Sequence, residues 1–500
     1  MKRTKRIISV MLAVMLLCAS PTVLAAPAKS NIADGSTYPT IILGGGWHKL
    51  VYEEPGLEGQ TAFDSQDLGD LFAPLLDEAL SALTAFDVDG LVDVAKNALW
   101  DMLGPIRMDE NGESVANIVD GIDNYENDNV YSNTIWCYLD WRLDPMENAE
   151  SLHEFIVYLQ EERGVDKFHL KGMSASGPIL LAYLKLYGYD SAASIVFDIS
   201  MHNGTTLFGG MAKRQITLDT EALGKLSIPT IGDVGIPSLQ PWLHILYETG
   251  LIDFIDMFLA MKAQPFFDRI YDEILIPLIF MMPVFWSYVP TEDYEEAKEA
   301  LLQGDPKYAN LVTKLDRYHN DVQLHADEII LSAAEHVKVG VRASYGIPLL
   351  PIVQGAAVQA DLLLDTVHAS MGATCAPLET PFGPWYRQKV KDGHDHISPD
   401  RLIDASTCLL PEQTWFNYKR PHKSDSNYSG WYDWFKRTDN PTVFDNEAYP
   451  QFVEESEPYV FVPMEREQPT LFESVLKTIG LHLLKIWRWL LLMPLNWIVG

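Results

Sequence analysis

Short apolar runs alternate with longer amphipathic stretches through the first half of the chain. Four runs are typical of buried strands, within residues 39–50, 130–142, 166–172 and 191–200. The stretches 149–165 and 175–188 instead place their apolar residues at helical spacing. Strands that alternate with helices favour a mostly parallel sheet covered by helices on both faces. The first half therefore predicts an α/β fold.

The alternation stops over residues 211–335, where apolar helical sequence takes over. Pro265, Pro277 and Pro283 interrupt its most apolar part, so a single continuous spanning helix is disfavoured. The strand rhythm resumes at 337–346. We therefore expect an α/β core in two parts, 26–210 and 336–470, with a helical insertion at 211–335. The insertion is either the core of a helical subdomain or an apolar cap over a binding site.

The two ends of the chain have their own patterns. Residues 1–25 show a basic start, an apolar run and small residues before Ala26, which is typical of a bacterial secretory signal peptide. Residues 471–500 form a basic, tryptophan-rich amphipathic helix. Such a helix lies in a membrane interface or docks on the domain or a partner chain, and a membrane span is a third reading. We expect a secreted or cell-surface protein.

Acidic residues outnumber basic ones, and the net charge is −32. Four basic residues leave with the signal peptide, which gives about −36. Such a surface repels phosphates at long range, so nucleic acid is a poor partner. Cys137, Cys375 and Cys408 remain after cleavage. Export permits a disulfide, for which Cys375 and Cys408 are the favoured pair, although sequence does not fix the connectivity.

The segment Gly172-Met173-Ser174-Ala175-Ser176-Gly177 joins a strand-like run to a helical one. It approximates the G-x-S-x-G turn that exposes a nucleophilic serine, and its context of strand and helix is the one that this geometry needs. The alternative is a serine in an ordinary small-residue turn. Because a serine hydroxyl is a weak nucleophile, it needs a histidine base and an acid that orients the base. Later in the chain, Asp400 and then His422 follow in the order Ser, Asp, His.

Three further segments resemble the α/β-hydrolase lipases, including lecithin:cholesterol acyltransferase-like enzymes. They are "DWRLDP" at 140–145, "MHNGTTL" at 201–207 and "SPDRLIDAS" at 398–406. The resemblance covers roughly residues 38–425 and implies the α/β-hydrolase fold, with Asp400 in the place of the catalytic acid. Arg401 stands where the family has glycine, which leaves Asp404 as an alternative acid. Ser176 likewise replaces the second glycine of the serine turn.

The tetrahedral intermediate of such a reaction needs hydrogen-bond donors for its oxyanion. We expect them from the backbone of Ala175 and from Gly45, Gly46 and Trp47, although the glycines could also simply form a turn. No cofactor is expected. His394 and His396 could hold a metal, but a solvated turn is the favoured interpretation. His48 and His202 are interpreted as structural hydrogen-bonding residues.

The sequence thus predicts a secreted serine hydrolase that cleaves carboxylic esters of lipid-like substrates. The apolar insertion favours an acyl chain, because each buried methylene contributes about 0.8 kcal/mol. Two alternatives remain. An acyltransferase would use the same serine and pass the acyl group to an alcohol, and a catalytically silent, membrane-associated binding module would keep only the fold.

Overall fold

The computed structural model describes residues 38–44, 47–64, 88–217, 219–226, 264–422, 429–457 and 460–465. The residues up to Pro463 form one compact unit, and the chain from Met464 on forms a second. The expected signal peptide and C-terminal amphipathic helix both lie outside the described residues, as do residues 227–263 of the expected insertion.

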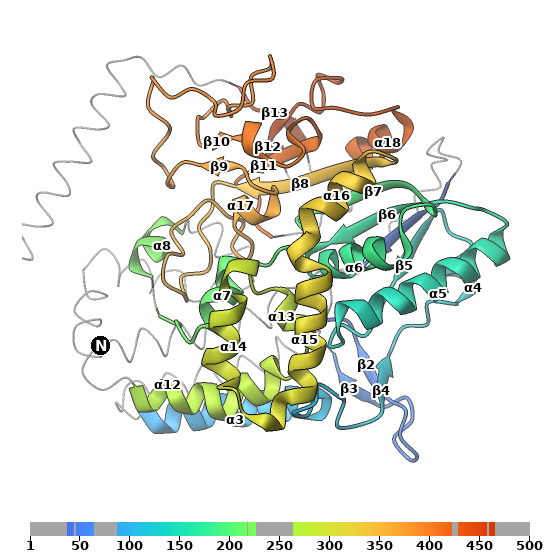
Figure 1. Cartoon of the computed structure of the whole chain (residues 1–500), viewed down its shortest axis with the longest axis vertical. Coiled ribbons are helices and arrows are strands. Elements are labelled where there is room, and N and C mark those ends of the chain that lie inside the picture. Colours follow the sequence, from blue (N-terminus) through green and yellow to red (C-terminus); the bar gives the residue numbers. More distant parts are fainter. Residues whose placement is uncertain are drawn as a thin grey trace, which may run out of the picture. The chain divides into compact units, whose positions relative to one another are not determined.

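The unit to Pro463 is built on an eight-stranded sheet with the order β13-β12-β11-β8-β7-β6-β1-β5 (Figure 1). Neighbouring strands are parallel from β5 to β12, and only β13 is antiparallel to its neighbour. The strands are β1 (Thr40–Leu43), β5 (Thr134–Cys137), β6 (Phe168–Met173), β7 (Ala192–Asp198), β8 (Lys338–Tyr345), β11 (Thr414–Tyr418), β12 (Phe452–Glu457) and β13 (Val460–Pro463). The prediction of a mostly parallel α/β sheet is confirmed.

Two small antiparallel sheets flank this one. They join β3-β2-β4, which are Thr61–Phe63, Leu50–Tyr52 and Ile118–Asp120, and β10-β9, which are Ile403–Asp404 and Thr374–Cys375. The sequence pattern did not predict either sheet, because strands of two or three residues are too short to show a periodicity.

Helices occupy the connections. They are α3 (Val88–Leu103), α4 (Asn127–Val130), α5 (Pro145–Arg163), α6 (Gly177–Tyr187), α7 (Thr206–Ala212), α8 (Thr220–Lys225), α12 (Gln264–Ile270), α13 (Val284–Ser287), α14 (Tyr294–Leu302), α15 (Ala309–Asp321), α16 (Ala326–Ala334), α17 (Thr366–Ala369) and α18 (Ser429–Arg437). A π-helix at Tyr271–Phe280 follows α12 and contains Pro277. The described parts of 211–335 are therefore helical apart from turns and an isolated bridge at Ile216.

Helix α5 shows how local sequence sets an element's limits. It begins four residues before the start of the predicted stretch because the Asp144 side chain accepts a hydrogen bond from the Met146 N–H at 2.6 Å, with Pro145 in the first turn. It ends at Gly164, whose φ of 64° is left-handed and suits glycine at a helix end.

One core cluster packs α5, α6 and α16 on one face of the sheet (Figure 1). Ile195 and Phe197 of β7 point into it, whereas Val196 between them points to the opposite face and packs with Trp431 and Phe435 of α18. This alternation is the two-residue period of a strand covered on both sides. Ala326, Ile330 and Ala333 of α16 belong to the same core, so the end of the helical region packs directly on the α/β core.

Cys137, Cys375 and Cys408 are all free thiols in this structure. The expected bridge between Cys375 and Cys408 is therefore absent. In the β9–β10 pairing, Ile403 rather than Cys408 lies opposite Cys375. Within the described residues, no helix combines the length and the apolar character that crossing a bilayer requires.

Candidate functional site

Ser174 lies at the sharp turn between β6 and α6. Its φ of 49° is a left-handed value that residues other than glycine rarely adopt. The turn is tight on both sides. A Cβ at Gly172 would lie 2.8 Å from Leu180 Cδ2, and one at Gly177 would lie 1.8 Å from Ser200 Oγ. The small residues at these positions are therefore required by packing, and the strained turn places the Ser174 side chain at the carboxyl edge of the sheet.

Ser176 replaces the second glycine of the expected motif without disturbing the turn. Its hydroxyl oxygen accepts a hydrogen bond from the Met173 N–H at 2.8 Å. Its proton faces the carbonyl oxygens of Met173 at 2.7 Å and Leu43 at 3.1 Å. The side chain thus ties the serine turn to the end of β1.

His422 lies beside Ser174, although the two residues are separated by 248 positions in the chain. The His422 Nε2 atom is 2.7 Å from Ser174 Oγ, and both side chains are buried. His422 follows β11, and Ser174 follows β6. Because these strands are parallel, their carboxyl ends meet at one edge of the sheet, where the two side chains come together.

The carboxylate that faces this histidine belongs to Asp361. His422 Nδ1 is 2.8 Å from Asp361 Oδ2, and the Asp361 side chain is fully buried. The other carboxylate oxygen accepts the backbone N–H groups of Leu363 at 3.1 Å and Leu364 at 2.8 Å. These bonds fix the carboxylate in one orientation. Leu362, which lies between Asp361 and Leu363 in the chain, has a left-handed φ of 90°.

The expectation that Asp400 or Asp404 is the acid partner of His422 is wrong. Asp400 Oδ2 accepts from the Tyr345 hydroxyl at 3.1 Å, and Asp400 Oδ1 accepts from Ser398 at 2.6 Å. Burial raises the pKa of Asp400. Asp404 Oδ2 accepts from the Tyr386 hydroxyl at 2.7 Å and from the Lys389 N–H at 2.9 Å. Although burial opposes it, these hydrogen bonds lower the pKa of Asp404.

The sequence prediction did not include Asp361, because the similarity of "SPDRLIDAS" to lipase segments favoured Asp400 as the acid. A simpler signal was present in the chain. Asp361 is the first acidic residue after the strand that resumes the α/β alternation, β8. A connection at the carboxyl end of that strand lies two strands from β6, within reach of the serine.

The expected oxyanion donors are only partly described. Gly45 and Gly46 lie outside the described residues. Gly44, the residue after β1, lines the same cavity as Ala175, the residue after Ser174. Trp47 has a left-handed φ of 60°, and its ring stacks on Trp141 with 4.8 Å between centroids.

A small, largely apolar cavity adjoins the serine turn. The insertion contributes Val284 and Tyr288 to its wall, and the core contributes Trp141, Ala175 and Ile179. The remaining lining residues are Leu43, Gly44, Cys137, Leu139 and Ser176. Val284, the first residue of α13, and Tyr288, which follows α13, therefore lie beside the serine turn, and the Tyr288 hydroxyl donates to the Ala175 carbonyl oxygen at 3.3 Å.

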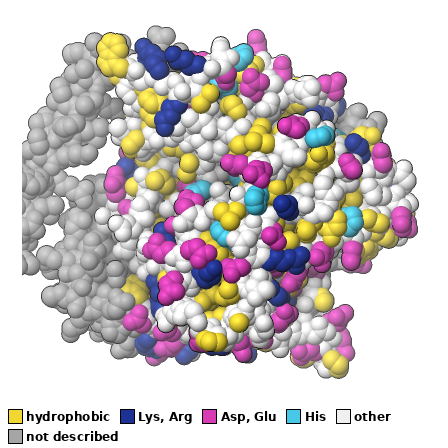
Figure 2. Space-filling model, viewed as in Figure 1, with side chains coloured by type: hydrophobic (Ala, Val, Ile, Leu, Met, Phe, Trp, Pro, Cys, Tyr) yellow, Lys and Arg dark blue, Asp and Glu magenta, His cyan; other side chains and the backbone are white. Residues whose placement is uncertain are grey.

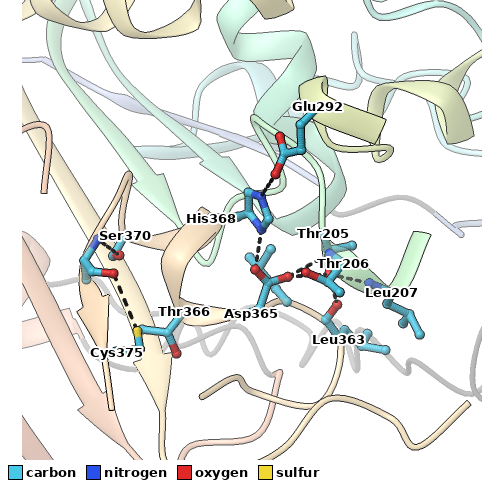
Figure 3. Close-up of polar contacts among 12 residues, drawn as sticks. Thr205, Thr206, Leu207, Glu292, Leu363, Asp365, Thr366, His368, Ser370 and Cys375 are labelled. Carbon is cyan, nitrogen blue, oxygen red and sulfur yellow. Dashed lines mark hydrogen bonds and ion pairs between the residues drawn. The ribbon is translucent and has the colours of Figure 1, made fainter. Parts of the chain in front are cut away.

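A second group of charged residues, Asp365, His368 and Glu292, connects the loop that carries Asp361 to the helical region (Figure 3). His368 Nδ1 contacts Asp365 Oδ2, and His368 Nε2 is 3.4 Å from Glu292 Oε1. The other oxygen of Asp365 accepts from the Thr205 hydroxyl at 3.1 Å and the Thr206 N–H at 2.8 Å. Burial works against a charged imidazole, but the two carboxylates raise the pKa of His368 to about 10.

The other histidines highlighted by the sequence have structural partners. His48 Nε2 is 2.6 Å from Asp120, and His202 Nδ1 is 3.2 Å from the Ser200 carbonyl oxygen. Burial, together with the charge of His368, lowers the pKa of His202 to about 4. His396 is buried and lies 2.8 Å from Asp392 and 2.9 Å from Gln451.

His394 stacks on the Phe444 ring. Across the described part of the chain, no cluster of three or more His, Cys, Asp and Glu side chains has a geometry suited to a metal ion.

Comparison of the whole chain with models of protein families, with curated proteins and with solved structures finds no match.

Proposed function

We propose that this protein is a serine hydrolase that cleaves carboxylic esters through an acyl-enzyme intermediate. The observation that carries the proposal is the continuous chain of contacts from the Ser174 hydroxyl through the His422 imidazole to the Asp361 carboxylate, with distances of 2.7 and 2.8 Å. These residue types, in this order of contact, are what nucleophilic catalysis by serine requires.

The roles follow from the geometry. Ser174 Oγ attacks the ester carbonyl while His422 Nε2 takes the hydroxyl proton and then delivers it to the leaving alcohol. Asp361 accepts a hydrogen bond from the His422 Nδ1–H group, which holds the imidazole in the tautomer whose Nε2 is free to act as a base. Water then attacks the acyl-enzyme with the same histidine as base, and the acid is released.

The oxyanion is stabilised by backbone N–H groups. The Ala175 N–H follows the nucleophile, and the loop that begins at Gly44 supplies the second donor through Gly45, Gly46 or Trp47. The shared cavity wall of Gly44 and Ala175 supports this pairing.

The order of strands supports an α/β-hydrolase fold. Ser174 follows β6, Asp361 follows β8 and His422 follows β11, so the three residues occur in the chain order of that fold. The similarity of 140–145 and 201–207 to lipase segments points the same way. The similarity of 398–406 to lipase segments does not identify the acid, because Asp361 contacts His422 instead.

The apolar cavity supports a lipid-like substrate. An alkyl group that packs against the apolar residues of its lining, which include Trp141, Ile179 and Val284, leaves water. A sugar or a charged peptide would lose hydrogen bonds to water there without replacement. We therefore propose lipase or carboxylesterase activity on esters with an alkyl chain.

A fluorophosphonate probe tests the nucleophile. We expect it to label the wild type, and we expect Ser174→Ala to abolish labelling. Ser191→Ala is a matched control. The Ser191 hydroxyl contacts the Tyr183 hydroxyl and not His422. A wild type that is not labelled would contradict the proposal and favour a silent binding module.

A second experiment separates hydrolysis from acyl transfer. The purified enzyme is given a long-chain p-nitrophenyl ester with and without an added alcohol, and the products are resolved by chromatography. We expect free acid as the main product in both mixtures. A main product that is the new ester would favour the acyltransferase.

A further inference from the structure

The segment 380–391, here named the Trp385 loop, differs in character from the rest of this acidic protein. Arg387, Lys389 and Lys391 are exposed, and the segment contains no acidic residue between Glu379 and Asp392. Trp385 is 86% exposed, more than any other large hydrophobic side chain among the described residues. Figure 2 shows Lys and Arg side chains gathered near an exposed hydrophobic group at the top of this face.

The tryptophan is presented by a tight turn. The Tyr386 N–H donates to the Gly383 carbonyl oxygen at 2.9 Å, which places Trp385 at the third position of a four-residue turn. The rings of Phe382 and Tyr386, which lie before and after Trp385 in the chain, stack with 3.9 Å between centroids. The turn that carries the exposed indole is therefore held by contacts on both sides of it.

The base of the loop is fixed by two residues that have no contact with the Ser174 site. Asp404 accepts hydrogen bonds from Tyr386 and from the Lys389 N–H. The Arg401 guanidinium donates to the carbonyl oxygens of Phe382 at 3.0 Å and Gly383 at 2.8 Å. The loop is thus held in one shape before it meets any partner, which lowers the entropic cost of binding.

The three basic side chains are available to a partner. Within the described residues, none of Arg387, Lys389 and Lys391 forms an ion pair, and the Arg387 guanidinium only donates to the carbonyl oxygens of Pro384 and Tyr386. In a chain with a net charge of −32, a segment with three unpaired cations is a local exception.

We propose that the Trp385 loop docks the protein on an anionic lipid surface. An amphipathic indole enters the headgroup region, and nearby Lys and Arg side chains pair with anionic headgroups. Arg401, which binds the loop, is next in sequence to Asp400, and Asp400 accepts a hydrogen bond from Tyr345, the last residue of β8.

The test is sedimentation of the full chain with vesicles. One set of vesicles is phosphatidylcholine alone, and the other is phosphatidylcholine mixed with phosphatidylglycerol. We expect Trp385→Ala to weaken binding to both sets. We expect neutralisation of Arg387, Lys389 and Lys391 to glutamine to weaken binding to the anionic set only, by about fivefold for each charge. Thermal unfolding checks that the variants fold.

A matched control removes Lys185, Lys307 and Arg437, which are also exposed. We expect these changes to leave vesicle binding intact. An equal loss in the control, no loss in the loop variants, or no vesicle binding by the wild type would overturn the proposal. The proposal would also be overturned if the loop variants keep vesicle binding but lose binding to soluble polyglutamate, since that result would make an acidic polymer the partner of the loop.

The proposal does not depend on ester hydrolysis. We expect Ser174→Ala to bind vesicles as the wild type does. An inactive protein that still binds through the loop would therefore reject the proposed function and retain the docking surface.

Discussion

Asp361 and His422 are joined twice. The side chains meet at 2.8 Å between Oδ2 and Nδ1, and the His422 backbone N–H donates to the Asp361 carbonyl oxygen, also at 2.8 Å. The backbone bond fixes the spacing of the two loops, so the side-chain contact depends little on either loop alone. This arrangement keeps the imidazole oriented toward Ser174.

The first prediction concerns the acid. Asp361→Asn should lower kcat for ester hydrolysis by about 10⁴-fold, because an amide can donate to Nδ1 and favour the wrong tautomer. Asp400→Asn and Asp404→Asn serve as controls and should stay within about tenfold of the wild type, since neither side chain contacts His422. Steady-state kinetics with a soluble ester measures all three. A larger loss in Asp400→Asn than in Asp361→Asn would restore the acid predicted from the sequence.

The second prediction concerns the cavity beside the serine turn. Val284→Phe should fill part of it and lower kcat/KM for long-chain esters on the order of tenfold, while acetate esters are spared. Val157→Phe on the outer side of α5 is the control, because Val157 is exposed and distant in the fold. Equal losses for long and short chains would show that the acyl group lies elsewhere.

The third prediction concerns the packing of the serine turn. Gly177→Ala should destabilise the protein by about 1–3 kcal/mol, because the new Cβ collides with Ser200 Oγ. Adding Ser200→Ala removes that atom and should recover part of the loss. Gly383→Ala, where no atom lies within 4 Å of the new Cβ, should unfold like the wild type. Urea denaturation measures these differences, and an unchanged midpoint in Gly177→Ala would contradict the close packing.

The fourth prediction concerns pH. The pKa of His368 in the folded protein is about 10, above its ordinary value of 6.5, so the folded state holds this proton more tightly than the unfolded chain. The resulting stabilisation is complete below about pH 6.5 and is lost as the pH rises toward 10. His368→Gln should remove this part of the pH dependence and cost roughly 3 kcal/mol at pH 7, since it leaves Asp365 buried without its cation.

Exposed His325 offers the comparison for that experiment. Its Nδ1 is 2.9 Å from Glu328 at the surface, so His325→Gln should leave the profile of stability against pH unchanged. Denaturation midpoints measured at intervals from pH 6 to about pH 10 would decide the matter. A wild-type profile that does not fall in this range would contradict the assigned charge of His368.

The sequence predicted the sheet and the serine turn because both depend on local patterns. Apolar strand runs separated by helical stretches define a parallel sheet, and the small residues around Ser174 are demanded by contacts within its own turn. His422 was predicted from its order after the serine. The limits of α5 could also have been read from Asp144, Pro145 and Gly164.

The acid could not be found by local pattern, since Asp361 follows a connection without helix or strand and its partner lies 61 residues further on. Likewise, nothing near Arg401 in sequence shows that its guanidinium reaches back to Phe382 and Gly383. The departure from the lipase motif at Arg401 thus has a physical reason, because Arg401 holds the Trp385 loop together with Asp404.

Asp361 and Asp365 lie at the two ends of one five-residue stretch, and each is tied to a different part of the molecule. One end orients the imidazole of His422, and the other end is gripped by Thr205, Thr206 and His368, which reaches Glu292 in the helical region. The stretch 361–365 therefore joins the contacts made with the helical region, through Asp365 and His368, to the carboxylate that contacts His422.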